Sequence, residues 1–423
     1  MIRTIVLQQK EERDALLQCE YVARTWEGEV EDYLTSGLIK LITGPRRAGK
    51  SVFALQLLKQ KKFAYLNFDD NLLLKHFDEN NLWQALLEIY PDFDYLLLDE
   101  IQNLPAWELW IAKLYRRGVN LIITGSNSKL LSGEMATALT GRFVQFSILP
   151  FSYEEVLAWN NIPTVSDTPT QRALLLQQLT EILKYGAFPE TVKLRSLTRN
   201  YLSALYDSII LKDVTKRFKI RNTNELYHLS AYLLTNYCNP FSATQLAEEQ
   251  NIGNVHTVQK FCKYLTESYL FFFLSRYNNK LKIMKKAPQK VYVIDNGFVA
   301  AQSFELSENR GRLLENLVFI ELLRRGYNTQ QTLFYYRTRN DKEIDFVCRN
   351  ITQIEKLIQV SYDLQHPKTY NREISALIEA SGELKCSNLL ILTWDDERTV
   401  KENGVSISII PVWKWLLKIR CEI

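Results

Sequence analysis

The stretch LITGPRRAGKSVF, residues 41–53, constrains what this chain can fold into more than any other stretch. From Gly44 to Ser51 it fits the pattern G-x-x-x-x-G-K-[ST], between a short apolar run and a helical pattern. The glycines let backbone N–H groups curl around phosphate oxygens, and the N-terminus of the next helix adds partial positive charge. The sequence therefore predicts a strand over residues 38–43, a phosphate-binding loop and a helix, rather than a basic surface turn.

Within this loop the side chains have separable expected roles. Lys50 is long enough to reach the β- and γ-phosphates, and the Ser51 hydroxyl is a suitable Mg²⁺ ligand. ATP and Mg²⁺ are therefore the predicted cofactors. The predicted nucleotide contacts are Gly44, Pro45, Arg46, Arg47, Ala48, Gly49, Lys50, Ser51 and Val52.

Later strand ends supply candidates for the chemistry. The apolar run YLLLDE ends in Asp99, a predicted Mg²⁺ ligand, and Glu100, which is predicted to polarise the attacking water. IITGSNS ends another strand, where Ser126 or Asn127 could contact the γ-phosphate or the attacking water, or could form an ordinary turn. Arg142, in LTGRF, could stabilise transition-state charge from a neighbouring subunit or be a surface arginine.

These motifs resemble a known family. The runs GPRRAGKS, LLLDEIQNLPAWE, ITGSNSKLLSGEMATALTGRFVQFSILPFSYEEVL and YGAFPE look like the AAA-type ATPases of bacteria and archaea that carry a C-terminal domain of unknown function. That family lies near the origin-recognition and STAND branches of the AAA+ class. The resemblance covers nearly the whole chain and implies an AAA+ core with a Mg–ATP site.

The resemblance also assigns residues. It implies that Lys50 and Ser51 match the Walker A motif, Asp99 and Glu100 the Walker B motif, and Ser126 the sensor-1 region. It implies that Arg142 matches the arginine of the family's G-R motif. This match favours a role as an arginine finger, which stabilises transition-state charge from a neighbouring subunit. Gly186 and Pro189 match a glycine–proline motif near the lid, although the family often has a second glycine where Ala187 stands.

A chain of 423 residues is too long for one ordinary domain, and strands alternating with helices predict an α/β class with a parallel sheet covered on both faces. We expect an AAA+ P-loop ATPase core over residues 1–150 and a helical lid over 151–222. A winged helix-turn-helix is expected over 223–300. A restriction-endonuclease-like α/β domain, degenerate in its active site, is expected over 301–423.

The expected helix-turn-helix has a turn at Asn251-Ile252-Gly253 and a basic run at its wing, RYNNKLKIMKKAPQK, residues 276–290. With a formal net charge of only +4, attraction to nucleic acid must be local. The predicted contacts to double-stranded DNA are His256, Lys260, Lys263, Lys282, Lys285 and Lys286. The alternative is a protein-interaction module, because the fold alone does not determine function.

The last domain resembles a nuclease that has lost its active site. Glu315 on a helix and Asp345 in EIDFV match acidic positions of the restriction-endonuclease-like fold. The Glu-x-Lys position reads Gln359-Val360-Ser361, which supplies neither the anionic ligand nor the cation. Cleavage of nucleic acid is therefore not expected.

Six cysteines without a C-x-x-C pair indicate a reduced, cytoplasmic compartment, and no apolar run is long enough to cross a membrane. The leading hypothesis is a homo-oligomeric AAA+ ATPase that couples Mg–ATP binding or hydrolysis to a DNA- or protein-binding C-terminal module. The second is a slow, nucleotide-regulated switch or scaffold with a protein partner. The third is an ATP-dependent nuclease.

Overall fold

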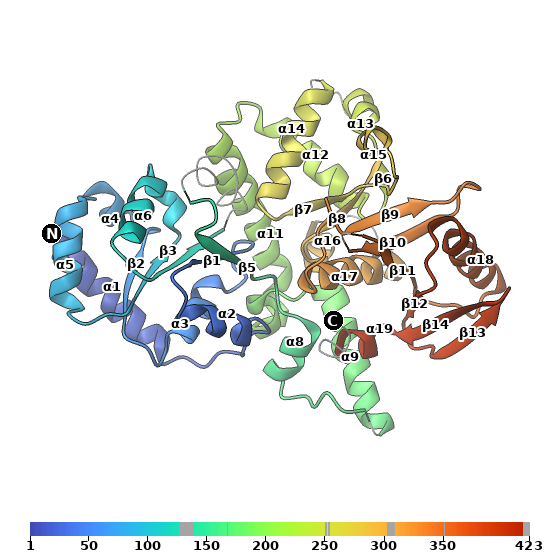
Figure 1. The fold of residues 1–423 in the computed structure, drawn as a ribbon, viewed down its shortest axis with the longest axis horizontal. Helices are drawn as coiled ribbons and strands as arrows, with labels where there is room; N and C mark the ends of the chain where they lie inside the picture. Colours follow the sequence, from blue (N-terminus) through green and yellow to red (C-terminus); the bar gives the residue numbers. More distant parts are fainter. Residues whose placement is uncertain are drawn as a thin grey trace. The chain divides into compact units, whose positions relative to one another are not determined.

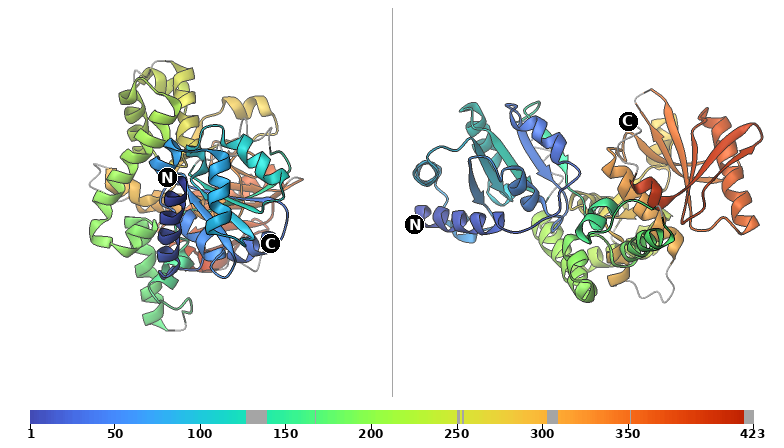
Figure 2. Two further views of the ribbon diagram at one scale, coloured as in Figure 1. Left: turned by 90° about the vertical axis from the view of Figure 1, so that its left-hand side faces the viewer. Right: turned by 90° about the horizontal axis from the view of Figure 1, so that it is seen from below.

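The computed structural model of the chain describes residues 1–126, 139–166, 168–249, 252, 254–302, 309–350 and 352–417. The chain forms two compact units (Figures 1 and 2). The first comprises Met1–Pro150 with Glu267–Tyr269, and the second comprises Phe151–Thr266 with Leu270–Ile423.

The first unit is built on a parallel sheet with the strand order β2-β3-β4-β1-β5. The strands are β1 (Ile39–Thr43), β2 (Phe63–Asn67), β3 (Tyr95–Asp99), β4 (Leu121–Gly125) and β5 (Phe143–Ser147). All residues of β1, β3 and β4 are buried, which explains why their sequences are mainly apolar and do not alternate with polar residues. The predicted strands at 38–43 and 95–100 are confirmed as β1 and β3.

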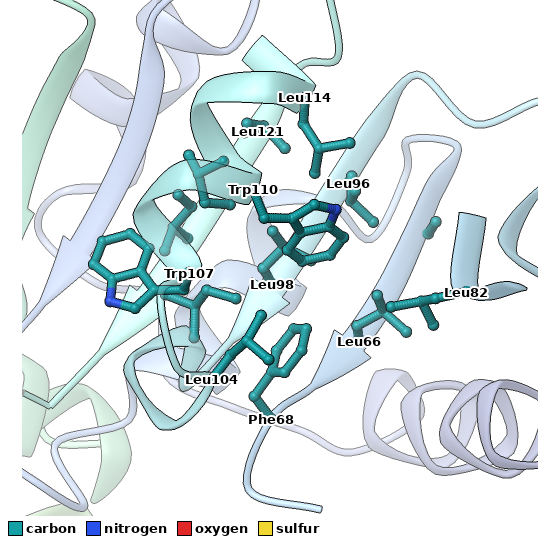
Figure 3. Close-up of a cluster of buried hydrophobic side chains, with 14 of the residues drawn as sticks. Leu66, Phe68, Leu82, Leu96, Leu98, Leu104, Trp107, Trp110, Leu114 and Leu121 are labelled. Carbon is teal, nitrogen blue, oxygen red and sulfur yellow. The ribbon is translucent and has the colours of Figure 1, made fainter. Parts of the chain in front are cut away.

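Helices cover both faces of this sheet. They are α1 (Ile2–Leu17), α2 (Glu27–Leu34), α3 (Lys50–Leu57), α4 (Asn71–Lys75), α5 (Glu79–Ile89) and α6 (Trp107–Arg116), with a short 3-10 turn η1 (Ile101–Asn103). On one face, Trp107 and Trp110 of α6 pack with Leu96 and Leu98 of β3 (Figure 3). On the other face, Leu97 packs with side chains of α2 and α3. The sheet is thus the middle of three layers, with a core on each side.

The second unit begins with helices. They are α8 (Tyr153–Trp159), α9 (Pro169–Tyr185), α10 (Pro189–Lys193), η3 (Arg195–Leu197), α11 (Thr198–Ser208), the π-helical η4 (Ile209–Lys216) and α12 (Thr223–Thr235). Local sequence fixes two of their starts. Ser152 with Glu155, and Thr168 with Gln171, form reciprocal capping boxes at α8 and α9.

A small antiparallel sheet follows, in the order β6-β8-β7. Its elements are β6 (Pro240–Phe241), α13 (Ala243–Glu249), α14 (Val255–Glu267), β7 (Phe271–Leu274), α15 (Leu281–Lys286), β8 (Gln289–Val293) and α16 (Asn296–Gln302). Two helices, α13 and α14, are followed by the antiparallel pair β7 and β8 in the region where a winged helix-turn-helix is predicted. The winged helix-turn-helix itself stays a prediction. Asn251 and Gly253 of the predicted turn lie outside the described residues.

The rest of the second unit is a mixed sheet in the order β13-β14-β12-β11-β10-β9. Its elements are α17 (Arg310–Arg324), β9 (Leu333–Arg337), β10 (Glu343–Arg349), β11 (Ile354–Ser361), α18 (Pro367–Leu384), β12 (Leu389–Thr393), β13 (Arg398–Glu402), β14 (Val405–Pro411) and α19 (Val412–Leu417). Strands β11, β12 and β14 are parallel, and the outer pairings are antiparallel. The apolar side of α18 packs against this sheet.

The GAFPE segment between α9 and α10 is held by a buried carboxylate. Asp295 accepts hydrogen bonds from the backbone N–H groups of Ala187 (2.7 Å) and Gly297 (2.8 Å). Gly186 has φ 74°, and a Cβ there would lie 1.7 Å from Asp295 Oδ1. Only glycine fits this position, which gives a physical reason for the glycine of the motif.

Among the residues described by the structure, no helix has both the length and the apolar composition needed to span a membrane.

Candidate functional site

The loop between β1 and α3 requires its glycines. Gly44 has φ 146°, and a Cβ there would lie 2.0 Å from the carbonyl oxygen of Ile148. Gly49 has φ 90° and caps the N-terminus of α3. The loop therefore turns the chain tightly from the end of β1 into the start of α3. It consists of Gly44, Pro45, Arg46, Arg47, Ala48 and Gly49, and the first turn of α3 is formed by Lys50, Ser51 and Val52.

A buried arginine braces this loop. Arg24 donates to the carbonyl oxygen of Ala48 (3.0 Å) and to that of Leu149. Sequence reasoning missed this residue, because Arg24 lies outside any motif and is separated from its second partner by 125 positions.

Four predicted site residues meet at the start of α3. The Lys50 ammonium is buried and donates to the carbonyl oxygen of Pro45 (3.0 Å), with Glu100 Oε1 at 3.7 Å. The Ser51 hydroxyl donates to Asp99 Oδ1 at 2.8 Å. Since β1 and β3 are parallel strands of one sheet, their carboxyl ends bring the loop and the two acids to the same edge.

The two acids have different electrostatic surroundings. Burial, followed by the neighbouring charge of Glu100, raises the pKa of Asp99, against hydrogen bonds from Thr124 and Ser51. Burial also acts to raise the pKa of Glu100, but Lys50, Gln102 and Arg46 hold it below its usual range. Glu100 is thus an anion at neutral pH, as a group that accepts a proton from water must be.

Neighbouring side chains hold Glu100 in position. Its backbone adopts the left-handed region, with φ 50°, and its N–H donates to the Thr124 hydroxyl at 3.1 Å. The Ser126 hydroxyl donates to Glu100 Oε2 at 3.3 Å, and the amide of Gln102 donates to the same oxygen. Ser126 therefore contacts the predicted base, while Asn127 lies outside the described residues. The sequence analysis assigned no role to Gln102 or Thr124, although both lie in runs that carry the family resemblance.

Arg142 does not join this constellation. It directly precedes β5, and its carbonyl oxygen accepts from the N–H of Ile39 at the start of β1. Its guanidinium lies 5.6 Å from the centre of the Tyr115 ring. Arg142 therefore sits at the amino edge of the parallel sheet, while Lys50 and Asp99 sit at the carboxyl edge. A five-residue strand spans roughly 15 Å, which places Arg142 away from a nucleotide bound at the carboxyl edge of the same chain.

The carboxyl edge fits a Mg-nucleotide. Ser51 Oγ and Asp99 Oδ1 are two oxygen ligands that already lie 2.8 Å apart. Mg²⁺ in nucleotide sites takes few protein oxygens and completes its shell with phosphate and water oxygens. Among the described residues, no group of three or more His, Cys, Asp or Glu side chains is placed to hold a metal ion.

The positions predicted to form a degenerate nuclease-like site lie on neighbouring elements of the second unit. Glu315 lies on α17, Asp345 on β10, and Gln359 and Ser361 on β11. Gln359 Oε1 accepts from the N–H of Asp345 (2.7 Å), and Asp345 Oδ2 accepts from the N–H of Val360 (2.9 Å). Ser361 Oγ donates to the carbonyl oxygen of Asp363 (3.2 Å).

A lysine from outside this domain occupies the centre. Lys290 of β8 places its Nζ 2.7 Å from Glu315 Oε1, 2.9 Å from Glu343 Oε1 and 3.3 Å from Asp345 Oδ1. A metal ion that used these oxygens would have to lie where the ammonium lies. The residues present therefore do not fit a divalent metal, and no cleavage step can be derived from this centre.

The predicted DNA contacts are exposed. His256, Lys260 and Lys263 are exposed on α14, and Lys282, Lys285 and Lys286 are exposed on α15. Two of the six basic residues in the 276–290 run turn inward, however. Lys290 is buried as described, and Arg276 donates to the carbonyl oxygen of Arg337 (3.0 Å). The basic surface at the predicted wing is thus smaller than the sequence suggests.

Comparisons with known proteins agree with the fold of the first unit. Residues 36–157 match a family model described as an AAA domain. Residues 176–309 and 310–415 match two domains of unknown function, DUF8612 and DUF4143. Among solved structures, the Walker-type ATPase paby2304 of Pyrococcus abyssi has a TM-score of 0.42 at 16% identity, over 68% of this chain and 99% of that one. The ORC1 protein of Aeropyrum pernix, solved in complex with DNA, has a TM-score of 0.31 at 14% identity, over 74% and 97%.

Two relatives match along nearly their full length. An uncharacterized protein of Methanocaldococcus jannaschii is 35% identical over 413 residues, which are 93% of this chain and 92% of the relative. One of Haemophilus influenzae is 34% identical over 398 residues, which are 90% and 94%. With the AAA domain and the phosphate loop in place, the chain belongs to the AAA+ ATPase family, in the group that carries a C-terminal domain of unknown function.

Proposed function

We propose that the chain binds and hydrolyses Mg–ATP and couples this reaction to DNA held by α14 and α15. The observation that carries the ATPase proposal is the meeting of Lys50, Ser51, Asp99 and Glu100 at one edge of the sheet. Each of these groups has a different task in phosphoryl transfer. Because they lie close together, phosphate binding, metal binding and water activation require no distant residue of the same chain.

The residues would act as follows. Loop N–H groups and the Lys50 ammonium bind the β- and γ-phosphates, and Ser51 and Asp99 hold the cation. When bound, Mg²⁺ supplies positive charge to the phosphate oxygens. Glu100 orients a water molecule and accepts its proton as the water oxygen bonds to the γ-phosphorus and ADP leaves. Ser126 and Gln102 keep the Glu100 carboxylate from rotating away.

The DNA part of the proposal rests on exposed charge. Lys260 and Lys263 on α14, and Lys282, Lys285 and Lys286 on α15, are all exposed. Ammonium groups on a helix face release counterions when they bind phosphates, which makes binding strongly salt-dependent. A protein partner is the second candidate, because Leu281 (73% exposed) and Ile283 (47% exposed) lie on α15 among the same lysines.

The test compares ATP turnover and binding of labelled double-stranded DNA across a salt series. Replacing Lys282, Lys285 and Lys286 by Glu should abolish DNA binding and leave ATP binding intact. The control replaces Lys368, Lys385 and Lys401, which are exposed elsewhere on the same unit, by Glu. If both triple variants lose DNA binding equally, or if the affinity does not change with salt, α15 is not a DNA contact and the protein-partner role gains support.

A further inference from the structure

A single buried lysine joins the predicted wing to the C-terminal sheet. Lys290 lies on β8, the middle strand of the β6-β8-β7 sheet, and its side chain is 1% exposed. Three carboxylates surround its ammonium, Glu315 from α17 and Glu343 and Asp345 from β10, at 2.7, 2.9 and 3.3 Å. Tyr292, two residues after Lys290 on the same face of β8, also donates its hydroxyl to Glu315 (2.8 Å).

The three carboxylates around the Lys290 ammonium stabilise its charged form. Burial alone would lower the pKa of Lys290, but the carboxylates of Glu315, Asp345 and Glu343 raise it well above its usual value. Burial and the Glu315 charge raise the pKa of Asp345 at the same time, since three acids share one ammonium. Removing the lysine would take the ammonium away from the buried carboxylate of Asp345 and from the partly buried Glu315, while Glu343 would keep its ion pair with Arg337 (3.1 Å). Leaving a buried carboxylate without its partner is strongly destabilising.

The ammonium occupies the point at which the acids converge. Oxygen-bound divalent cations lie about 2.0–2.6 Å from their ligands, so the ammonium and a metal ion at these oxygens exclude one another. We propose that Lys290 is a permanent internal cation that takes the place of a divalent metal ion in the nuclease-like centre, closing the centre to metal. The inference does not depend on the proposed ATPase and DNA-binding functions.

Side chains of α17 and β9 form hydrogen bonds with the backbone on both sides of Lys290 and hold its strand next to the acids. Asn316 of α17 bonds both the N–H and the carbonyl oxygen of Val293, each at 2.9 Å. The Tyr335 hydroxyl of β9 donates to the carbonyl oxygen of Pro288 at 2.6 Å. Strand β8 is thus tied to α17 and β9 on either side of the lysine, which keeps the Lys290 backbone beside the three acids. Residues 270–302 and 309–417 lie in one compact unit, although separate family models meet at residues 309 and 310.

The main test uses Lys290→Met, which keeps the length of the side chain and removes its charge. The full chain carries Asp99→Asn, so that the nucleotide site contributes no metal binding, and is titrated with Mn²⁺ by calorimetry without nucleotide. With Lys290 present, no Mn²⁺ should bind at this centre. With Lys290→Met, a Mn²⁺ site should appear and should vanish when Asp345→Asn is added. A Mn²⁺ site sensitive to Asp345→Asn in the chain with Lys290, or a folded Lys290→Met chain without a new site, would overturn the proposal.

Thermal unfolding keeps the proposal testable if Lys290→Met does not fold. Adding Glu315→Gln and Asp345→Asn removes the excess negative charge, so this triple variant should fold where the single variant fails. If the triple variant is as unstable as the single variant, charge compensation is not the role of Lys290 and the proposal is wrong. Lys282→Met, on the exposed surface of α15, is the matched control and should change neither unfolding nor Mn²⁺ binding.

Discussion

Glu100 illustrates how one residue receives its chemical role from its neighbours. Its carboxylate accepts from Ser126 and Gln102 and lies 3.7 Å from the Lys50 ammonium. These contacts favour the charged form despite burial, whereas Asp99, one residue earlier, has its pKa raised by burial. The sequence pair Asp-Glu identifies both acids, but only the structure shows that the two carboxylates face different partners.

Glu100→Gln should keep ATP affinity and lower kcat by about 100-fold or more, because the amide cannot accept a proton from water. ATP binding by fluorescence and turnover by phosphate release measure the two effects separately. Glu11→Gln, on the exposed surface of α1, is the control and should leave both unchanged. Wild-type turnover in Glu100→Gln would show that another group activates the water.

Asp295 should make the second unit less stable as pH rises. Burial raises its pKa to about 7, whereas an unfolded aspartate titrates near pH 4. Between about pH 4 and pH 7 the folded chain therefore holds the extra proton, so the free energy of unfolding falls with increasing pH across that window. Urea unfolding at several pH values measures the slope. Asp295→Asn removes the titrating group and should flatten that slope, and an unchanged slope would assign it to another residue.

At the scale of elements, local patterns predict what local forces determine. The apolar runs at β1 and β3 and the glycines between β1 and α3 could be read from the sequence, because burial and tight turns restrict residue type locally. Lys290 could not be read in this way. In the sequence it belongs to a basic run, and its counter-ions Glu315, Glu343 and Asp345 come from other elements. One signal was available, since Lys290 and Tyr292 alternate with apolar residues and therefore share a strand face.

The loop between α9 and α10 offers a test of packing against strain. Gly186→Ala would combine a left-handed backbone with a Cβ placed 1.7 Å from Asp295, and should cost more than 2 kcal/mol, roughly the upper cost of the backbone term alone. Gly326→Ala is the matched control, because Gly326 has φ 89° and open space around its Cβ. Denaturant unfolding of the two variants should differ clearly. Equal losses would mean that the contact with Asp295 adds nothing.

At the scale of the whole molecule, we propose that Arg142 of a neighbouring chain completes the site. Lys50, Ser51, Asp99 and Glu100 meet at the carboxyl edge of the first sheet, and Arg142 lies at the amino edge. An arginine finger acts on charge that develops in the transition state, and supplying it from a neighbour makes turnover depend on assembly. The sequence could predict the arginine but not its separation from the loop, because that separation follows from the strand directions.

Mixing two inactive variants should therefore restore turnover. Arg142→Ala keeps an intact phosphate loop but lacks the finger, and Lys50→Ala keeps the finger but lacks a phosphate contact. In a mixed assembly, an Arg142→Ala site can face a Lys50→Ala subunit that supplies Arg142, so ATP hydrolysis should exceed the sum of the two separate proteins. The gain should rise with total protein concentration, because assembly is bimolecular or higher in order.

The control for this experiment is a chain that carries both substitutions. Mixed with Arg142→Ala, it provides neither a finger nor a working loop, so no turnover should return. Arg142→Ala alone should still bind ATP nearly as tightly as the unmodified chain, since the finger contacts charge that the ground state has not yet developed. If the two single variants stay inactive together while light scattering shows mixed oligomers, Arg142 does not act across the subunit boundary. Its position above Tyr115 would then be a structural contact of the first unit.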